Sequence, residues 1–132
     1  MKKLLLFLLL AIHIPASSQT VSAYCDMQAT NFWGGRNIYI ILDLGAHGYG
    51  SITDSDGNAK KFSGIVDALN YMSKLGWSVV ESYYITEGQK VLHFLLEKKI
   101  TSDHQLLDGI NIKQQDRQLT EKKVYKPGND IY

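Results

Sequence analysis

Residues 63–77 read Ser-Gly-Ile-Val-Asp-Ala-Leu-Asn-Tyr-Met-Ser-Lys-Leu-Gly-Trp, and this stretch decides the fold class. Ser63 predicts a helix N-cap, because its hydroxyl can accept a hydrogen bond from a free backbone N–H of the first turn. Gly76 predicts the helix end, where glycine readily adopts the left-handed conformation. We therefore expect a helix from Ser63 to Leu75 with one apolar face. The apolar residues at helical spacing are Ile65, Val66, Ala68, Leu69, Met72 and Leu75.

Strands are predicted before this helix. Residues 21–30 alternate apolar and polar side chains, which is typical of a half-buried strand. Residues 38–44 are rich in β-branched and aromatic residues and predict a second strand that pairs with the first as an antiparallel hairpin. Residues 50–53 and 59–62 predict a further short hairpin around a turn at 54–58.

Two more strands are predicted after the helix. Trp77 opens a strand that runs to about Thr86, and residues 91–98 return after the turn Glu87-Gly88-Gln89. This order indicates an α+β fold, in which a small antiparallel sheet of four or more strands has one helix packed on one face.

The N-terminus has the features of a secretory signal. Lys2 and Lys3 precede an apolar run from Leu4 to Ile14, interrupted by His13, and small residues follow. The run is too short to cross a bilayer, which requires ~20 residues. We expect residues 1–18 to be a signal peptide, cleaved after Ser18, and the product to be periplasmic or secreted. No later segment approaches membrane-spanning length.

The remaining chain predicts one domain and a tail. The length of 132 residues suffices for a single modest core. We expect residues 19–100 to form a single α+β domain and residues 101–132 to be a charged, mostly disordered tail, because no apolar period persists there. The alternative is that the tail folds back through its apolar residues, which are Leu106, Leu107, Ile110 and Ile112.

Two stretches carry a resemblance to known proteins. Residues 68–77, Ala-Leu-Asn-Tyr-Met-Ser-Lys-Leu-Gly-Trp, and 91–99, Val-Leu-His-Phe-Leu-Leu-Glu-Lys-Lys, are similar to a group of small exported bacterial proteins of unknown function. The order of helix, Gly-Trp, strand and lysine-ended strand also resembles, more loosely, a short uncharacterised α+β domain family. The resemblance covers residues 38–100 and implies a small antiparallel sheet with a helix on one face. It implies no catalytic residues.

Several chemistries lack support in the sequence. Arg36 and Arg117 are the only arginines and the net charge is +1, so no basic excess favours nucleic acid. The glycine-rich stretch 45–51 lacks the lysine and the following helix of a phosphate-binding loop. In a calcium loop that begins at Asp54, Ala59 would stand in the place of the sharp-turn glycine and Ile65 in that of the distal acid, so we interpret 54–58 as a turn. No cofactor and no metal site are predicted.

Nucleophiles and general bases are equally few. Cys25 lies on the apolar side of its strand, where a thiol is usually inert. His93 stands between Leu92 and Phe94, which favours a packed, hydrogen-bonded histidine. No histidine pair has zinc-ligand spacing, and no catalytic residue is predicted. An envelope enzyme with a pocket around His93 or His47 remains the alternative.

The strongest functional indication is a second apolar sheet face. Several predicted strands are apolar on both sides, and such strands are usually covered on both faces, whereas one helix covers only one. We expect Tyr39, Tyr84 and His93 to bind on this face, with Tyr24 as a further candidate. The tail, a second copy in a homodimer, or a partner such as an envelope protein, peptide or glycan would cover it. This predicts a small exported non-enzymatic binding or self-associating module; a structural accessory that acts through its tail is a further alternative.

Overall fold

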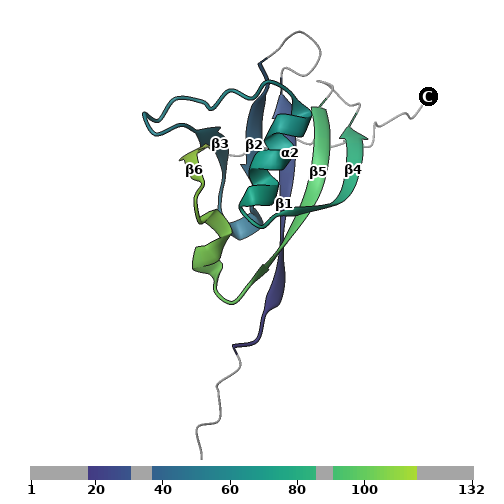
Figure 1. Ribbon diagram of the computed structural model, residues 1–132, viewed down its shortest axis with the longest axis vertical. Coiled ribbons are helices and arrows are strands. Elements are labelled where there is room, and N and C mark those ends of the chain that lie inside the picture. The colour runs from purple at the N-terminus through teal and green to yellow at the C-terminus, as the bar shows by residue number, and fades with distance from the viewer. Residues whose placement is uncertain (1–17, 31–36, 86–90, 116–132) are drawn as a thin grey trace, which may run out of the picture.

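The fold is a six-stranded antiparallel sheet with one α-helix packed against it (Figure 1). The computed structural model describes residues 18–30, 37–85 and 91–115. The strand order is β4-β5-β1-β2-β3-β6. The elements are β1 (Val21–Thr30), β2 (Tyr39–Asp43), η1 (Gly45–His47), β3 (Tyr49–Thr53), α2 (Ile65–Lys74), β4 (Ser78–Ile85), β5 (Val91–Ile100), η2 (Asp103–Leu107) and β6 (Asn111–Gln114).

The two predicted long hairpins are confirmed, and β1 joins them. β1 pairs antiparallel with β2 on one side and with β5 on the other, so that Met27 stands between Leu42 and Phe94. Cys25, Met27 and Ala29 all point into the core, which agrees with the alternation of apolar and polar residues along this strand. The α+β class with one helix on a sheet is confirmed, and the sheet is larger than its predicted minimum.

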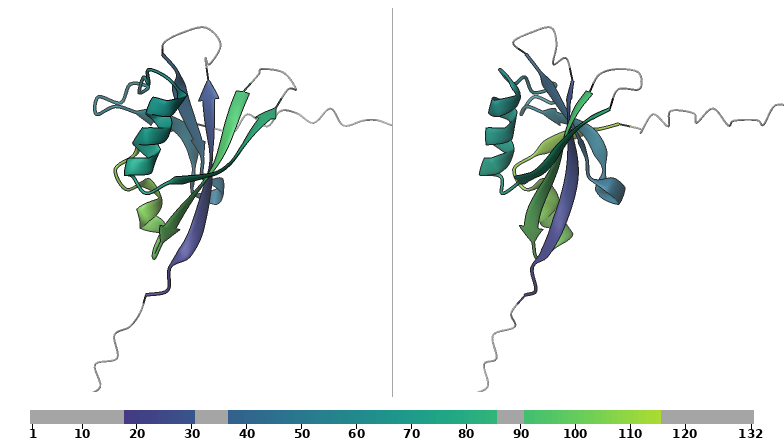
Figure 2. Two further views of the ribbon diagram at one scale, coloured as in Figure 1. Left: turned by 45° about the vertical axis from the view of Figure 1, so that its right-hand side comes forward. Right: turned by 90° about the vertical axis from the view of Figure 1, so that its right-hand side faces the viewer.

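Helix α2 packs on one side of the sheet, as the side view shows (Figure 2). Ala68 and Met72 are its most buried side chains, and they belong to the apolar stripe of the helix. Gly76 ends the helix with a φ of 89°, as predicted, and its N–H donates to the Ser73 carbonyl at 3.0 Å. We call the sheet face under α2 the helix-bearing face and the other the opposite face.

The start of the helix differs from the prediction. α2 begins at Ile65, with Gly64 as its N-cap, and no side chain caps the free N–H groups. Ser63 does not accept a hydrogen bond there. Instead its backbone N–H and its hydroxyl donate to Asp67 Oδ2, at 3.0 and 3.1 Å. The carboxylate of the first turn therefore reaches back to Ser63, one residue beyond the N-cap Gly64 that a capping box would use.

Residues 101–115 belong to the domain, so the predicted boundary at residue 100 and the disordered state of this part of the tail are wrong. β6 pairs with β3, with Ile52 opposite Ile112. Leu106 and Ile110 are buried in the core. The Tyr71 hydroxyl of α2 donates to the Gly109 carbonyl at 3.4 Å. This segment therefore folds back onto the helix-bearing face and extends the sheet, whereas the rest of the predicted tail, 116–132, lies outside the described residues.

The predicted short hairpin forms only in part. β3 matches its first half, and the turn is closed by Asp54 Oδ1, which accepts from the backbone N–H groups of Asp56 and Asn58. The second half contributes isolated bridges, Ala59 to Thr53 and Phe62 to Ile38. The turn interpretation of 54–58 is thus confirmed, because its carboxylate satisfies the local backbone.

The predicted signal peptide lies almost wholly outside the described residues, which begin at Ser18. Within the described ranges, no helix is long and apolar enough to cross a bilayer.

Candidate interaction surface

Strand β4 forms one edge of the described sheet. It pairs with β5 alone, and all eight of its residues are exposed. An edge strand presents a row of backbone N–H and C=O groups that can pair with another strand. The ribbon view places β4 at the sheet margin farthest from β6 (Figure 1).

The side chains of β4 are unusually apolar for such an edge. Of the eight large hydrophobic residues that are exposed in the described part of the chain, five lie on this strand: Val79, Val80, Tyr83, Tyr84 and Ile85. Glu81 is its single charged residue. We call this strand, with these five side chains, the β4 edge.

The other edge of the sheet is built differently. β6 has four residues, Asn-Ile-Lys-Gln, and three of them are exposed polar residues. Short length and an exposed lysine are features with which soluble proteins prevent sheet edges from pairing with other chains. β4 has neither feature, so the two edges of one sheet differ in how open they are to strand addition.

A bulge in β4 decides which tyrosine lies on which face. The register with β5 shifts between Val79 and Glu81. Tyr83 is consequently the cross-strand partner of His93 and lies on the opposite face. Tyr84 is the cross-strand partner of Leu92 and lies on the helix-bearing face. The expectation that Tyr84 shares a face with Tyr39 and His93 is therefore wrong. In the sequence, the position of the bulge coincides with Glu81, which interrupts an otherwise apolar row of this strand.

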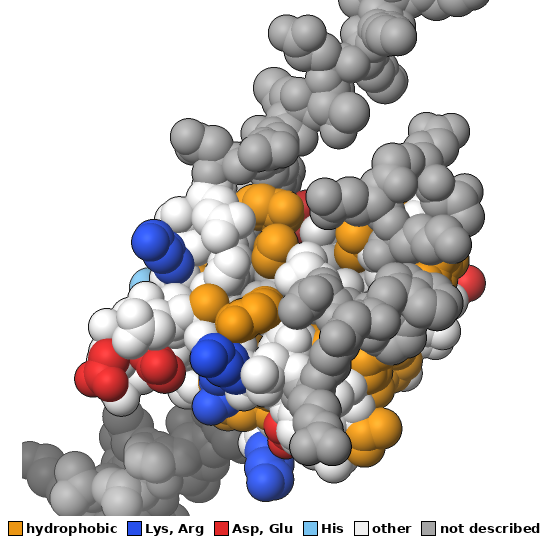
Figure 3. All heavy atoms as spheres, turned by 90° about the horizontal axis from the view of Figure 1, so that it is seen from above, with side chains coloured by type: hydrophobic (Ala, Val, Ile, Leu, Met, Phe, Trp, Pro, Cys, Tyr) orange, Lys and Arg blue, Asp and Glu red, His pale blue; other side chains and the backbone are white. Residues whose placement is uncertain are grey.

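The opposite face mixes polar and apolar side chains rather than being uniformly apolar. Tyr39 and Ile41 are half-buried on it, and Tyr24 is 53% exposed. The carboxylates of Asp26 and Asp43 come from directly paired positions on β1 and β2. In the view from above, which looks down on the molecule rather than onto this face, hydrophobic side chains are exposed in several places (Figure 3).

His93 forms a hydrogen-bonded cluster at the centre of that face. Its Nδ1 lies 2.8 Å from Asp26 Oδ2, and the ring of Tyr83 stacks on the imidazole with a centroid distance of 4.8 Å. The Gln28 amide also donates to Asp26 Oδ2, at 3.0 Å. Burial raises the pKa of Tyr83 to about 12, and the nearby Asp26 carboxylate adds to this rise. These contacts agree with the prediction of a packed, hydrogen-bonded histidine.

The structure separates Cys25 from His93. Cys25 points into the core on the helix-bearing face, and His93 lies on the opposite face. The pKa of the Cys25 thiol is raised to about 12, chiefly by burial and additionally by the carboxylates of Asp26 and Asp43. A thiol with such a pKa is a poor nucleophile at neutral pH, so these residues do not form a thiol–imidazole pair.

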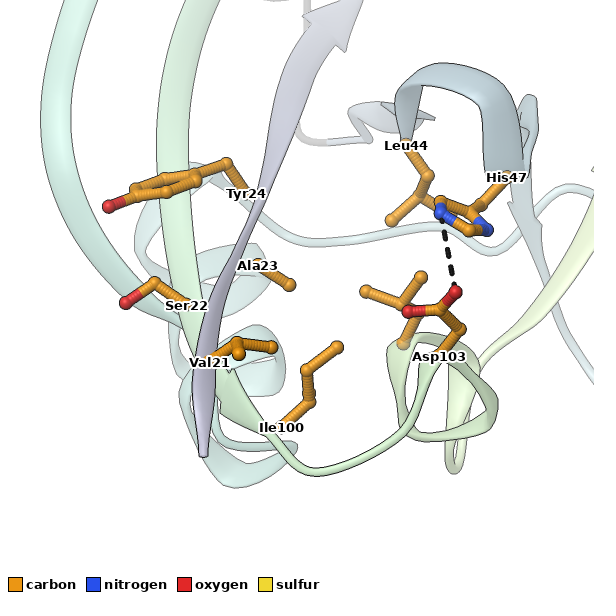
Figure 4. A pocket seen from close by; sticks show the side chains of 9 residues that line it. Val21, Ser22, Ala23, Tyr24, Leu44, His47, Ile100 and Asp103 are labelled. Carbon is orange, nitrogen blue, oxygen red and sulfur yellow. Dashed lines mark ion pairs between the residues drawn. The ribbon is translucent and has the colours of Figure 1, made fainter. Parts of the chain in front are cut away.

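The other histidine of interest, His47, lies at the rim of a hollow of about 240 Å³ (Figure 4). Its Nε2 is 3.8 Å from Asp103 Oδ2, and both side chains are well exposed, so this ion pair is weak. The inner wall is apolar, whereas Ser22 and Tyr24 point away from it in the close-up. The apolar lining consists of Val21, Ala23, Leu44, Ile100 and Leu106. The hollow therefore offers a reacting group few polar donors.

The described residues include no cluster of three or more His, Cys, Asp or Glu side chains placed to hold a metal ion. Comparison of the chain with known protein families, curated proteins and solved structures finds no match. The resemblance on residues 68–77 and 91–99 accordingly stays a prediction.

Proposed function

We propose that this protein is a small exported binding module of the cell envelope that acts without catalysis, and that it binds an extended segment of a partner chain along the β4 edge. The observation that carries the proposal is that all eight residues of β4 are exposed, among them five large apolar side chains that are 39–53% exposed. Export rests on the predicted signal peptide at residues 1–18.

Strand addition suits this edge for two physical reasons. The backbone groups along a sheet edge gain direct hydrogen bonds from an incoming strand, which gives affinity without a deep pocket. The alternating side chains then contact both faces of the added strand, and large apolar and aromatic residues contribute most to such contacts.

The alternative of a histidine-based enzyme has less support. His93 is only 6% exposed, and its ring is engaged by a carboxylate and a phenol ring. His47 borders a hollow with an apolar inner wall. Binding through Tyr39 and His93 alone is also less well supported than binding along β4, because both residues are less exposed than the β4 side chains.

A synthetic strand tests the proposal directly. A capped peptide with the sequence of residues 78–85 is titrated into residues 19–132 in a calorimeter, and hydrogen exchange locates where it binds. We expect binding that protects backbone amides of β4, and we expect Val80→Lys to weaken it, because a lysine discourages pairing at a strand edge.

The matched control is Val66→Lys, which makes the same change at an exposed valine of α2. It should leave peptide binding unchanged. Absence of peptide binding, or equal loss in both variants, would remove the proposed function. Export is tested separately by mass spectrometry of the secreted product, for which we expect Gln19 as the first residue.

A further inference from the structure

We infer that a hollow beside α2, distinct from the β4 edge, binds a phosphate group through three lysines. The hollow has a volume of about 170 Å³ and is lined by residues 60–62, which lead into α2, and by the helix itself. Lys60 and Lys61 come from the leading segment, and Lys74 comes from the last turn of α2. The hollow shares no residue with the β4 edge, so this site does not depend on the proposed function.

The segment that leads into α2 is fixed to the sheet. The Lys60 backbone N–H donates to the Ile52 carbonyl at 2.9 Å, and two backbone hydrogen bonds of 2.9 and 3.0 Å join Phe62 to Ile38. The Lys60 ammonium group lies 5.3 Å from the ring centroid of Tyr71 and 5.7 Å from that of Phe62, so cation–π attraction helps to hold it. One positive charge of the hollow is therefore in place before a ligand arrives, which lowers the ordering cost of binding.

Positive charge exceeds negative charge around the hollow. Three ammonium groups face a single carboxylate, that of Asp67, among the described lining residues. The Oδ2 atom of Asp67 already accepts hydrogen bonds from the backbone and the hydroxyl of Ser63. These bonds lower the pKa of Asp67 most, and the ammonium groups of Lys60 and Lys74 lower it further, so both lysines act on the same space. Three positive charges against one negative charge leave a local excess of two.

A phosphate monoester matches this excess better than a carboxylate does. It carries a charge of about −1.5 to −2 at neutral pH and presents three strong acceptor oxygens. Lysine binds phosphate as a compact point charge with three donors. Asn70 lines the hollow and lies four residues before Lys74 on the same side of α2, where its amide can donate as well. A carboxylate brings only one charge and would neutralise half of the excess.

Amide NMR spectra of residues 19–132, titrated with inorganic phosphate at constant ionic strength, test this site. We expect saturable shifts at residues 60–62 and 67–74 with a dissociation constant on the order of 1 mM or lower. Lys61→Gln combined with Lys74→Gln should raise that constant about tenfold or more. The matched control combines Lys99→Gln with Lys113→Gln, which removes the same charge at exposed positions of β5 and β6, and it should change the constant less than about twofold.

Two further titrations identify the source of the phosphate group. Glycerol 3-phosphate represents a soluble ester, and vesicles of phosphatidic acid, compared with vesicles of phosphatidylcholine, represent a lipid headgroup. Binding of the soluble ester alone would assign a small phosphorylated molecule, whereas vesicle binding that requires Lys61 and Lys74 would assign a lipid. Shifts that do not saturate, acetate bound as tightly as phosphate, or equal effects of the two lysine pairs in variants that circular dichroism shows to be folded would overturn the inference.

Discussion

His93 Nδ1 lies 2.8 Å from Asp26 Oδ2, so that a hydrogen bond links β5 to β1 on the opposite face of the sheet. The two residues are diagonal neighbours, because His93 stands directly opposite Gln28 and Asp26 directly opposite Leu95. The imidazole is almost wholly buried, and the ring of Tyr83 lies over it. This cluster couples the edge strand to the centre of the sheet.

Loss of the imidazole should destabilise the fold. We expect His93→Ala to lower the free energy of unfolding by about 2–4 kcal/mol, because it removes the imidazole partner of the half-buried Asp26 carboxylate and opens a cavity. Urea unfolding followed by tryptophan fluorescence measures this. The matched change His104→Ala, at an exposed histidine of η2, should cost less than about 0.5 kcal/mol. Equal costs for the two variants would show that the Asp26–His93 contact contributes nothing.

The helix start should respond to acid. Hydrogen bonds from the Ser63 backbone N–H and hydroxyl lower the pKa of Asp67 below its ordinary value of 3.8. A lowered folded-state pKa stabilises the fold above the unfolded-state pKa, and this contribution is lost as the pH falls through the folded-state value. Between neutral pH and about pH 3, the melting temperature of Asp67→Asn should therefore fall less than that of the native chain.

Asp108→Asn serves as the control for this pH dependence, because Asp108 is another exposed carboxylate. It should keep the native slope of melting temperature against pH. A slope for Asp67→Asn that equals the native slope would contradict the role of Asp67 at the helix start.

Gly50 allows β3 and β6 to approach each other. A Cβ at this position would lie 2.8 Å from the carbonyl carbon of Lys113, which is backbone and has little freedom to move. We expect Gly50→Ala to destabilise the protein by about 1–3 kcal/mol and to release β6 from the sheet. Hydrogen exchange should then accelerate at residues 111–114 before it does so elsewhere.

Gly64→Ala is the comparison for Gly50→Ala. A Cβ at Gly64 meets no atom within 4 Å, so exchange in β6 should remain at the native rate. Protection of β6 that is unchanged in Gly50→Ala would refute the steric argument.

The C-terminal boundary can be tested by truncation. Ending the chain after Ile100 removes β6 and the buried side chains of Leu106 and Ile110. We expect a loss of about 3 kcal/mol or more in the free energy of unfolding, because the truncation removes two buried aliphatic side chains and all four residue pairs between β3 and β6. Ending it after Gln115 keeps every described contact and should preserve the native melting temperature. Equal melting temperatures for both truncations would place residues 101–115 outside the folding unit.

The local elements of this fold were predictable, and their long-range partners were not. Helical periodicity over 65–75 and the following Gly76 indicated α2, because both signals come from residues within a few turns. The same holds for the alternation in β1, which identified Cys25 as a core residue. The apolar residues of 101–115 follow no sustained period, so local pattern does not indicate an element there.

The candidate site depended on information that local patterns lack. The prediction that Tyr39 and His93 share a face is correct. Because of the bulge before Glu81, however, Tyr83 lies on that face and Tyr84 lies on the other. A one-residue register shift moves every later side chain to the other face, and only hydrogen bonding to β5 sets that register.

By itself, the amino-acid sequence determined the class of fold, the positions of α2 and of five of the six described strands, and the turn at 54–58, since each depends on nearby residues. The tertiary structure alone decided that β1 lies between β2 and β5, that β6 completes one edge, and that β4 is left at the other. Strand order depends on pairings between residues far apart in the chain, and no short-range periodicity encodes them.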